Sequence, residues 1–147
     1  MTPLSPPELE LLRAARRAVL ATTADDGSPR LVPIAFVFVD GVVYSPLDEK
    51  PKKVSNPRDL ARVHDIEARP SVSVLVDNWS EDWTVLGWIR LSGNALLIEP
   101  DDQPDAEHAR AIGLLRQKYP QYVSQGLESR PVIRIQIDRA LSWFASP

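Results

Sequence analysis

Three of the four lysines in this chain of 147 residues fall close together, at Lys50, Lys52 and Lys53. They follow Val42-Val43-Tyr44-Ser45, which has strand composition, and they precede Asn56-Pro57-Arg58-Asp59, which is typical of a helix start. Ammonium groups clustered between a strand end and a helix start suit a phosphate, because lysine is a compact point charge and helix N-termini attract anions. The alternative interpretation is a solvated loop that happens to carry lysines.

Little else in the sequence is suited to acid–base, nucleophilic or metal chemistry. The chain has no cysteine, which excludes thiolate catalysis, disulfides and zinc–thiolate sites. Its two histidines, His64 and His108, fall in separate predicted helices, where isolated histidines usually pack or face solvent, so we predict no metal site. No glycine-rich phosphate loop and no nucleophile elbow is present. A redox cofactor would account for this composition, because flavin-type cofactors carry out hydride transfer themselves.

The aromatic residues with the largest surface are four tryptophans: Trp79, Trp83, Trp88 and Trp143. Trp88 and Trp143 lie in or next to predicted strands, where either core packing or a platform for a flat ring system is a reasonable interpretation. Trp79 and Trp83 lie in a polar loop, which leaves a pocket lid, an interface and simple half-burial as alternatives.

The composition is that of an ordinary globular protein, with 44% hydrophobic residues, 25% charged residues and a formal net charge of -3. This charge does not favour a nucleic-acid surface, which needs a basic face, so the expected partner is a small molecule or another protein. No apolar run approaches the roughly 18 residues of a membrane span, and the N-terminus lacks the features of a signal peptide. We therefore expect one domain over residues 1–147, located in the cytoplasm and without a membrane partner.

The first half of the chain reads as a helix followed by three strands. Ser5-Pro6-Pro7-Glu8 predicts a capped helix start, and residues 19–23 have strand composition. Residues 30–39 are apolar on both faces, which predicts a strand covered by the core on one side and by another layer or subunit on the other. Pro33 predicts an edge or an irregular pairing within that strand. Asp40-Gly41 is a hairpin signal that leads into the next strand.

The second half adds two helices and three strands. A helix is expected from Asn56 to Pro70, a strand over 71–76, and a long strand or hairpin over 84–99 with bulge or bend positions at Gly87 and Gly93. Another helix follows residue 104, and a final strand covers 132–138. Only one strand–helix–strand crossover occurs, so the order does not suit a parallel sheet. We predict a mainly β (α+β) fold, a six-stranded antiparallel Greek-key-like barrel with flanking helices, and the apolar strand suggests a homodimer.

Arg30 and Arg90 interrupt otherwise apolar strands. Their guanidinium groups must find water, a carboxylate or a ligand phosphate, because a buried unpaired charge is costly.

The order of these elements resembles the pyridoxamine 5'-phosphate oxidase-like split barrel family, over nearly the whole chain. Three segments resemble in particular a bacterial branch that depends on the deazaflavin coenzyme F420: Asp48-Glu49-Lys50-Pro51-Lys52, Arg69-Pro70-Ser71-Val72-Ser73-Val74-Leu75-Val76 and Trp88-Ile89-Arg90-Leu91-Ser92-Gly93. The motifs are short, and their order and spacing carry the resemblance.

The resemblance implies a homodimer that binds FMN or F420 in clefts at the subunit interface. It assigns cofactor contacts to Arg30, Val32, Pro33, Ile34, Tyr44, Ser45, Lys50, Lys52, Lys53, Trp88 and Trp143. Residues 30–34 and 44–45 would line the ring and the ribityl chain, largely through backbone groups, and the three lysines would hold the phosphate. Arg58 and Arg62 are candidates for the anionic tail of F420. No catalytic residue is assigned.

The function implied is an F420- or FMN-dependent oxidoreductase that transfers a hydride to or from a small organic substrate. Vitamin B6 oxidation is not expected, because no Arg-x-His segment for pyridoxal phosphate follows Trp143. A non-catalytic flavin- or haem-binding carrier of the same fold is the alternative, although His64 and His108 sit on predicted helices.

Overall fold

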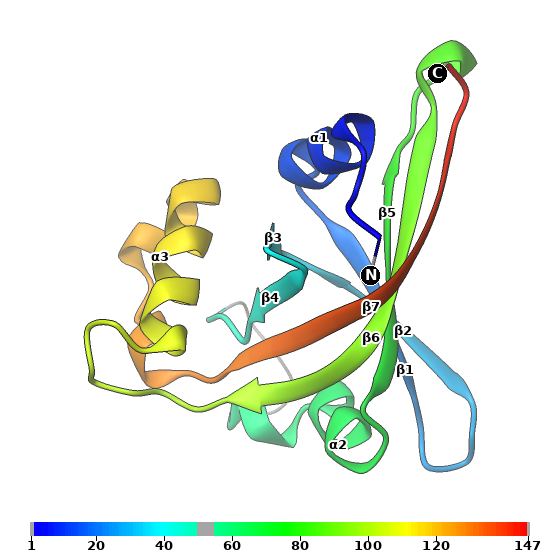
Figure 1. Ribbon diagram of the computed structural model, residues 1–147. Helices are drawn as coiled ribbons and strands as arrows, with labels where there is room; N and C mark the ends of the chain where they lie inside the picture. The colour runs from blue at the N-terminus through cyan, green and yellow to red at the C-terminus, as the bar shows by residue number, and fades with distance from the viewer. Residues whose placement is uncertain (1, 50–54, 147) are drawn as a thin grey trace.

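The computed structural model describes residues 2–49 and 55–146. In this part of the chain, one curled sheet carries three α-helices on its faces and edges (Figure 1). The strand order is β2-β1-β5-β6-β7-β4-β3, and every neighbouring pair is antiparallel. The predicted mainly β, antiparallel architecture with outer helices is therefore confirmed.

The strands are β1 (Ala18–Thr23), β2 (Pro29–Ile34), β3 (Val37–Val39), β4 (Val42–Pro46), β5 (Ser71–Asn78), β6 (Gly87–Ile98) and β7 (Val132–Phe144). The α-helices are α1 (Pro6–Ala14), α2 (Ala61–Ala68) and α3 (Glu107–Lys118). Short 3-10 helices are η1 (Pro57–Asp59), η2 (Trp83–Val85), η3 (Pro120–Ser124) and η4 (Leu127–Ser129).

The described residues form seven strands, so the prediction of six was wrong. The strand expected over residues 30–39 breaks at Ala35 and Phe36 into β2 and β3. The Phe36 N–H donates to the Tyr119 hydroxyl (3.0 Å), and the Ser45 hydroxyl donates to the Ala35 carbonyl (2.8 Å). Because side chains satisfy these backbone groups, the chain can leave one edge of the sheet at β2 and join the opposite edge at β3.

Local sequence signals explain most element boundaries. The predicted capping box is present at α1, where the Ser5 hydroxyl accepts from the Glu8 N–H and the Glu8 carboxylate accepts from the Ser5 N–H. Asn56 caps η1 rather than an α-helix, and α2 begins only at Ala61. Pro33 lies on the edge strand β2, opposite Val19, as its missing N–H predicts.

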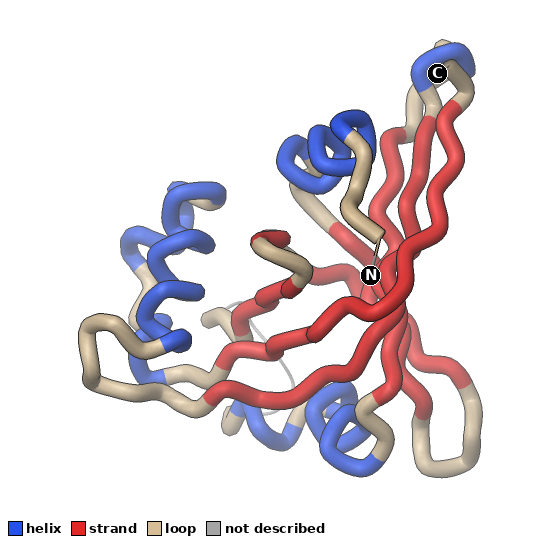
Figure 2. The backbone as a smooth tube through the Cα atoms, viewed as in Figure 1, coloured by secondary structure: helices blue, strands red, loops and turns tan. Residues whose placement is uncertain are grey.

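Strands β6 and β7 form the longest pairing of the sheet. Their register shifts between Ser92 and Gly93, which confirms the predicted irregularity at Gly93. Past this shift, β7 continues to Phe144, beyond the predicted end at residue 138. The extra length of β7 and the outer ends of β5 and β6 form an arm that projects from the rest of the sheet (Figure 2).

The core consists of two clusters on either side of the curled sheet. The larger cluster includes Leu12 from α1, Ile66 from α2 and the inward residues of β1, β5 and β6. The smaller cluster packs Leu115 of α3 against Tyr44 of β4 and Val132 of β7. Among the described residues, no helix is both long enough and apolar enough to cross a membrane.

Candidate functional site

A cavity of about 640 Å³ opens where the ends of β2 and β4 meet the start of α2 and the segment η3. It is lined by Arg16, Arg17, Val32, Pro33, Ile34, Ala35, Ser45, Pro46, Asp48, Leu60, Arg62, Tyr119, Gln121, Tyr122 and Gln125. We call it the arginine cavity. Its volume is in the range of pockets that hold small molecules and cofactors.

The floor of the arginine cavity is apolar, and it lies next to the break between β2 and β3. Val32, Pro33 and Ile34 come from the last residues of β2, and Pro46 comes from the end of β4. The hydrogen bond from the Ser45 hydroxyl to the Ala35 carbonyl ties these two strand ends together. These strand ends therefore offer apolar side chains, together with the backbone between them, to a ring system.

The charge of the arginine cavity is opposite in sign to that of the whole chain. Arg16, Arg17 and Arg62 line it against one acid, Asp48, although the chain as a whole has a net charge of -3. The Asp48 carboxylate accepts a hydrogen bond from the Tyr122 hydroxyl (2.5 Å). Burial, reinforced by this carboxylate, raises the pKa of Tyr122, so its hydroxyl stays protonated. The lining therefore favours an anion.

Arg62 differs from the other arginines of the cavity because one of its buried N–H groups makes no hydrogen bond within the described residues. Its Nε is buried and has no hydrogen-bond partner among the described residues. Burial lowers the pKa of its guanidinium group, and the nearby Asp48 charge counteracts this only in part. By contrast, Arg58 donates two hydrogen bonds to Glu99 (3.0 and 2.5 Å). An unsatisfied buried N–H of arginine beside a cavity is suited to a phosphate or carboxylate.

Tyr119 connects the wall of the arginine cavity to its floor. Its hydroxyl accepts from the Phe36 N–H and lies 3.1 Å from the Arg16 carbonyl. The guanidinium group of Arg16 lies 4.6 Å from the Tyr119 ring centroid and donates to the Lys118 carbonyl (2.7 Å). These contacts fix the residues before β1 against the end of α3, and they hold Arg16 at the edge of the arginine cavity.

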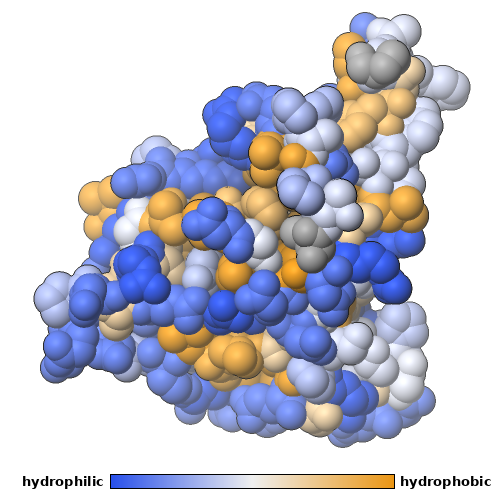
Figure 3. Space-filling model, in the orientation of Figure 1, coloured by the Kyte–Doolittle hydropathy of each residue, from blue (hydrophilic) through white to orange (hydrophobic). Residues whose placement is uncertain are grey.

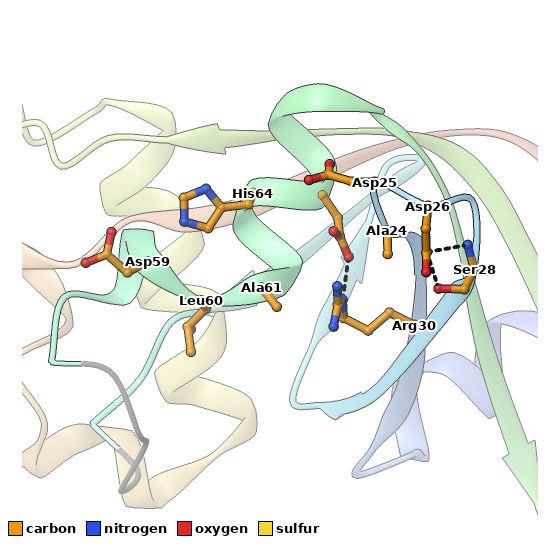
Figure 4. Close-up of a pocket in the computed structure, with 10 residues that line it drawn as sticks. Ala24, Asp25, Asp26, Ser28, Arg30, Asp59, Leu60, Ala61 and His64 are labelled. Carbon is orange, nitrogen blue, oxygen red and sulfur yellow. Dashed lines mark hydrogen bonds and ion pairs between the residues drawn. The ribbon is translucent and has the colours of Figure 1, made fainter.

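A larger, more open hollow of about 1100 Å³ lies between the β1–β2 turn and α2 (Figure 4). Its charged lining is mostly acidic: Asp25, Asp26, Asp59 and Asp65, with Arg30 and His64. Arg30 is occupied by an ion pair with Asp65 (2.7 Å), which also accepts from the Thr22 hydroxyl (2.7 Å). An acidic hollow repels phosphate, so the smaller arginine cavity is the better site for an anionic cofactor.

The Asp65 cluster should make stability depend on pH. Burial alone would raise the pKa of Asp65, but hydrogen bonds from Arg30 and Thr22 and the charges of Arg30 and Arg69 lower it. The folded pKa is then below the unfolded value, so this stabilisation is present above about pH 4 and lost as the pH falls through the folded pKa. Below about pH 4, the free energy of unfolding should fall more steeply with decreasing pH in the wild type than in Asp65→Asn. Denaturant titrations measure this; equal slopes would contradict the assignment.

Four residues predicted to contact a cofactor line the arginine cavity: Val32, Pro33, Ile34 and Ser45. The Tyr44 side chain points to the other side of β4, where its hydroxyl donates to Glu107 (2.5 Å). Burial, followed by the contact with Glu107, raises the pKa of Tyr44 to about 12. Adjacent residues of a strand face opposite sides, and in β4 the Ser45 side chain faces the arginine cavity while the Tyr44 side chain packs against α3.

The other predicted contact residues lie elsewhere. Arg30 lines the acidic hollow. Trp88 and Trp143 are directly paired across β6 and β7 on the projecting arm, and neither lines the arginine cavity of its own chain. Lys50, Lys52 and Lys53 fall outside the described residues.

Comparisons with known proteins show which family the chain belongs to. A family model described as pyridoxamine 5'-phosphate oxidase matches residues 6–144. The chain belongs to this family. The match confirms the family expected from the order of strands, helices and turns. A comparison with curated proteins found no match.

Solved structures share the family fold at low sequence identity. The conserved hypothetical protein Rv2991 from Mycobacterium tuberculosis has a TM-score of 0.72 and 20% identity, with 97% of this chain and 86% of that one covered. HutZ, the haem storage protein of Vibrio cholerae, has a TM-score of 0.69 and 16% identity, with 95% and 93% covered. An F420 reductase has a TM-score of 0.66 and 17% identity, with 95% and 98% covered. At these identities the likeness concerns the fold.

Sequence reasoning missed the residues that close the arginine cavity from the side: Arg16, Arg17, Tyr119, Gln121, Tyr122 and Gln125. Tyr119 and Arg16 are separated by 103 residues, and no local pattern connects them. The available signals were weak: two arginines before the first strand, and two tyrosines around Pro120 after a helix.

Proposed function

We propose that this member of the pyridoxamine 5'-phosphate oxidase family is an oxidoreductase that uses F420 or FMN and a small organic substrate. The single observation that carries the proposal is the arginine cavity. It combines an apolar floor with three arginines, and one of these, Arg62, has a buried Nε without a hydrogen-bond partner among the described residues. A flat ring with an anionic chain matches both features.

The residues of the cavity suggest how each part of the cofactor would be held. Val32, Pro33 and Ile34 would pack against the ring system, and Arg62 would bind a phosphate oxygen. Lys50 and its neighbours are proposed to complete the phosphate site, as the sequence predicts. When bound, a flavin or deazaflavin supplies the hydride transfer, and the protein positions it and excludes water. The F420 reductase of the same fold supports this class of cofactor.

A homodimer forms part of the proposal. The outer face of the sheet exposes Leu31 on β2 (67%), Leu75 on β5 and Leu141 on β7 (53%). Apolar side chains gathered on an open sheet face favour association with another surface. Trp88 and Trp143 lie on the arm, remote from their own chain's cavity. We propose that a second copy brings the partner subunit's Trp88 and the partner subunit's Trp143 to the cofactor.

Cofactor binding tests the proposal directly. The purified protein is titrated with FMN and with F420 while tryptophan fluorescence is followed, and native mass spectrometry with both cofactors in competition identifies the preferred one. We expect saturable quenching by one of them. Absence of binding at concentrations on the order of tens of micromolar would overturn the proposed cofactor. Oxidation of the reduced cofactor by enones, quinones or nitro compounds then separates an enzyme from a carrier.

The lysine segment offers a second test. The double substitution Lys50→Ala with Lys52→Ala should weaken cofactor binding strongly. It should leave the free energy of unfolding nearly unchanged if these lysines lie at the surface, as the sequence predicts, because surface charges contribute little to stability. Binding isotherms and urea denaturation of the same samples provide both measurements. If the double variant binds as well as the wild type, these lysines do not hold the phosphate.

A haem-binding carrier is a second candidate, supported by two observations. HutZ, a haem storage protein, shares the fold, and His64 lines the hollow of about 1100 Å³. His108 is the matched control, since it is buried and its Nε2 lies 2.7 Å from the Arg130 carbonyl. Haem titration followed by the Soret band should be abolished by His64→Ala and retained by His108→Ala if this candidate is correct.

A further inference from the structure

The connection between β5 and β6 carries two of the most exposed large side chains of the described residues. Trp79 is 65% exposed and Trp83 is 67% exposed, and Val85 beside them is also exposed. We call residues 79–86 the tryptophan tip. Apolar residues gather at this end of the arm in Figure 3. Tryptophan is the residue type most enriched at the energetic centre of protein interfaces, so two indoles in solvent call for a partner surface.

The tryptophan tip is held in one conformation by hydrogen bonds. The Asp82 carboxylate accepts from both the N–H and the hydroxyl of Thr84. The Asn78 side chain donates to the Val85 carbonyl (2.9 Å), and the Ser146 hydroxyl donates to the Thr84 carbonyl (2.7 Å). A loop that is already ordered loses little conformational entropy when a partner covers it.

The negative charge around the tryptophan tip favours a partner surface that is positively charged. Residues 77–87 contain three acids, Asp77, Glu81 and Asp82, and no basic residue. Such a segment is repelled by anionic membranes and by nucleic acids. It is complementary to a surface that combines arginines with apolar side chains, and the arginine cavity of this same chain is such a surface.

The tip of a given chain does not cover that chain's own cavity. No residue of segment 77–87 lines the arginine cavity. In Figures 1 and 2 the tip lies at the end of the arm, beside the C-terminus, while β4 and the segment after α3 lie across the sheet. Contact between a tryptophan tip and an arginine cavity therefore requires two copies of the chain.

We propose that in the homodimer the tryptophan tip of each protomer covers the mouth of its partner's arginine cavity. The indoles of Trp79 and Trp83 would lie against the partner subunit's Arg16 and the partner subunit's Arg17, where cation–π contacts and the nearby acids favour the pairing. A two-fold axis makes both contacts equivalent, so each cavity gains an aromatic wall from the other chain. This inference rests on the dimer of the proposed function, and it gives Trp79 and Trp83 a role in enclosing the substrate.

The absence of cysteine makes crosslinking a clean test. A tagged Trp83→Cys chain and an untagged Arg17→Cys chain are coexpressed, purified and treated with a short bismaleimide. We expect a covalent heterodimer that is absent when Asp101→Cys, another exposed position, replaces Arg17→Cys. Light scattering on the wild-type protein reports the oligomeric state, and titration of the wild-type protein with FMN or F420 reports cofactor binding, because Arg17→Cys alters the cavity itself.

The outcomes separate this inference from the proposed function. A dimer without crosslinking above the Asp101→Cys control overturns the tip contact and leaves the dimer and its cofactor in place. A monomeric wild-type protein overturns both the tip contact and the dimer. Absence of cofactor binding by the wild-type protein, together with intact crosslinking of the cysteine pair, overturns the proposed function and leaves the tip contact standing.

Discussion

Arg62→Met is expected to weaken binding of the cofactor by about 10- to 100-fold, because a hydrogen bond from a charged donor to a phosphate is worth about 1.5–3 kcal/mol. The same change should leave the cofactor-free protein at least as stable as the wild type. Methionine keeps the apolar part of the side chain and removes a charge that burial penalises. Isothermal titration with the cofactor that binds the wild type, together with thermal unfolding of the free protein, measures both effects.

Arg58→Met is the matched control for Arg62→Met. Arg58 lies four residues earlier, in η1, and its guanidinium group is already engaged with Glu99 at the surface. We expect its loss to change cofactor affinity by about 2-fold or less and stability only slightly. If the two variants bind the cofactor equally well, or if Arg62→Met unfolds the protein, Arg62 is a structural residue and the assignment of the anion site fails.

Gly93→Ala is expected to destabilise the fold by about 3 kcal/mol or more. A Cβ atom at Gly93 would lie 1.9 Å from the Gln136 carbonyl oxygen of β7, which is far inside contact distance. The neighbouring atom belongs to the backbone, so no side-chain rotation can relieve the clash. The two longest strands would have to separate at their register shift. A loss of this size is a large fraction of the 5–15 kcal/mol typical of a domain.

Gly113→Ala provides the control for the glycine variant. Gly113 lies on the exposed side of α3, and nothing lies within 4 Å of an added Cβ atom. Alanine is preferred to glycine in a helix interior, so Gly113→Ala should stabilise the protein by about 0.5–1 kcal/mol. Chemical denaturation of both variants measures the difference, and a neutral Gly93→Ala would show that the β6–β7 pairing tolerates a wider spacing than the structure has.

Some features of the fold depend only on residues close together in the sequence, and these features could be predicted from the sequence. Ser5 and Glu8 form the capping box whose spacing they predict. Gly93 marks the register shift, because a residue without a side chain permits close approach of another strand. Pro33 lies on an edge strand, since it has no N–H to donate to a second neighbour. Each of these outcomes depends on one residue and its immediate surroundings.

Only the tertiary structure decides which residues, among those able to form hydrogen bonds or ion pairs, come into contact. The break between β2 and β3 depends on Tyr119, which follows Phe36 by 83 residues and bonds its backbone. The arginines look alike in the sequence, but Arg30 and Arg58 find carboxylates while the Arg62 Nε remains unpaired within the described part of the chain. Pairing of this kind depends on distances between segments, which no local pattern encodes.

The sequence by itself therefore determined the family, the antiparallel class of the fold and the apolar strand residues that now form the floor of a cavity. Only the tertiary structure separated Trp88 and Trp143 from that floor within one chain, and only it brought Arg16 and Tyr119 beside Val32. The physical reason is that side-chain type and periodicity report burial along one element. The contents of a cavity depend instead on how separate elements pack around it.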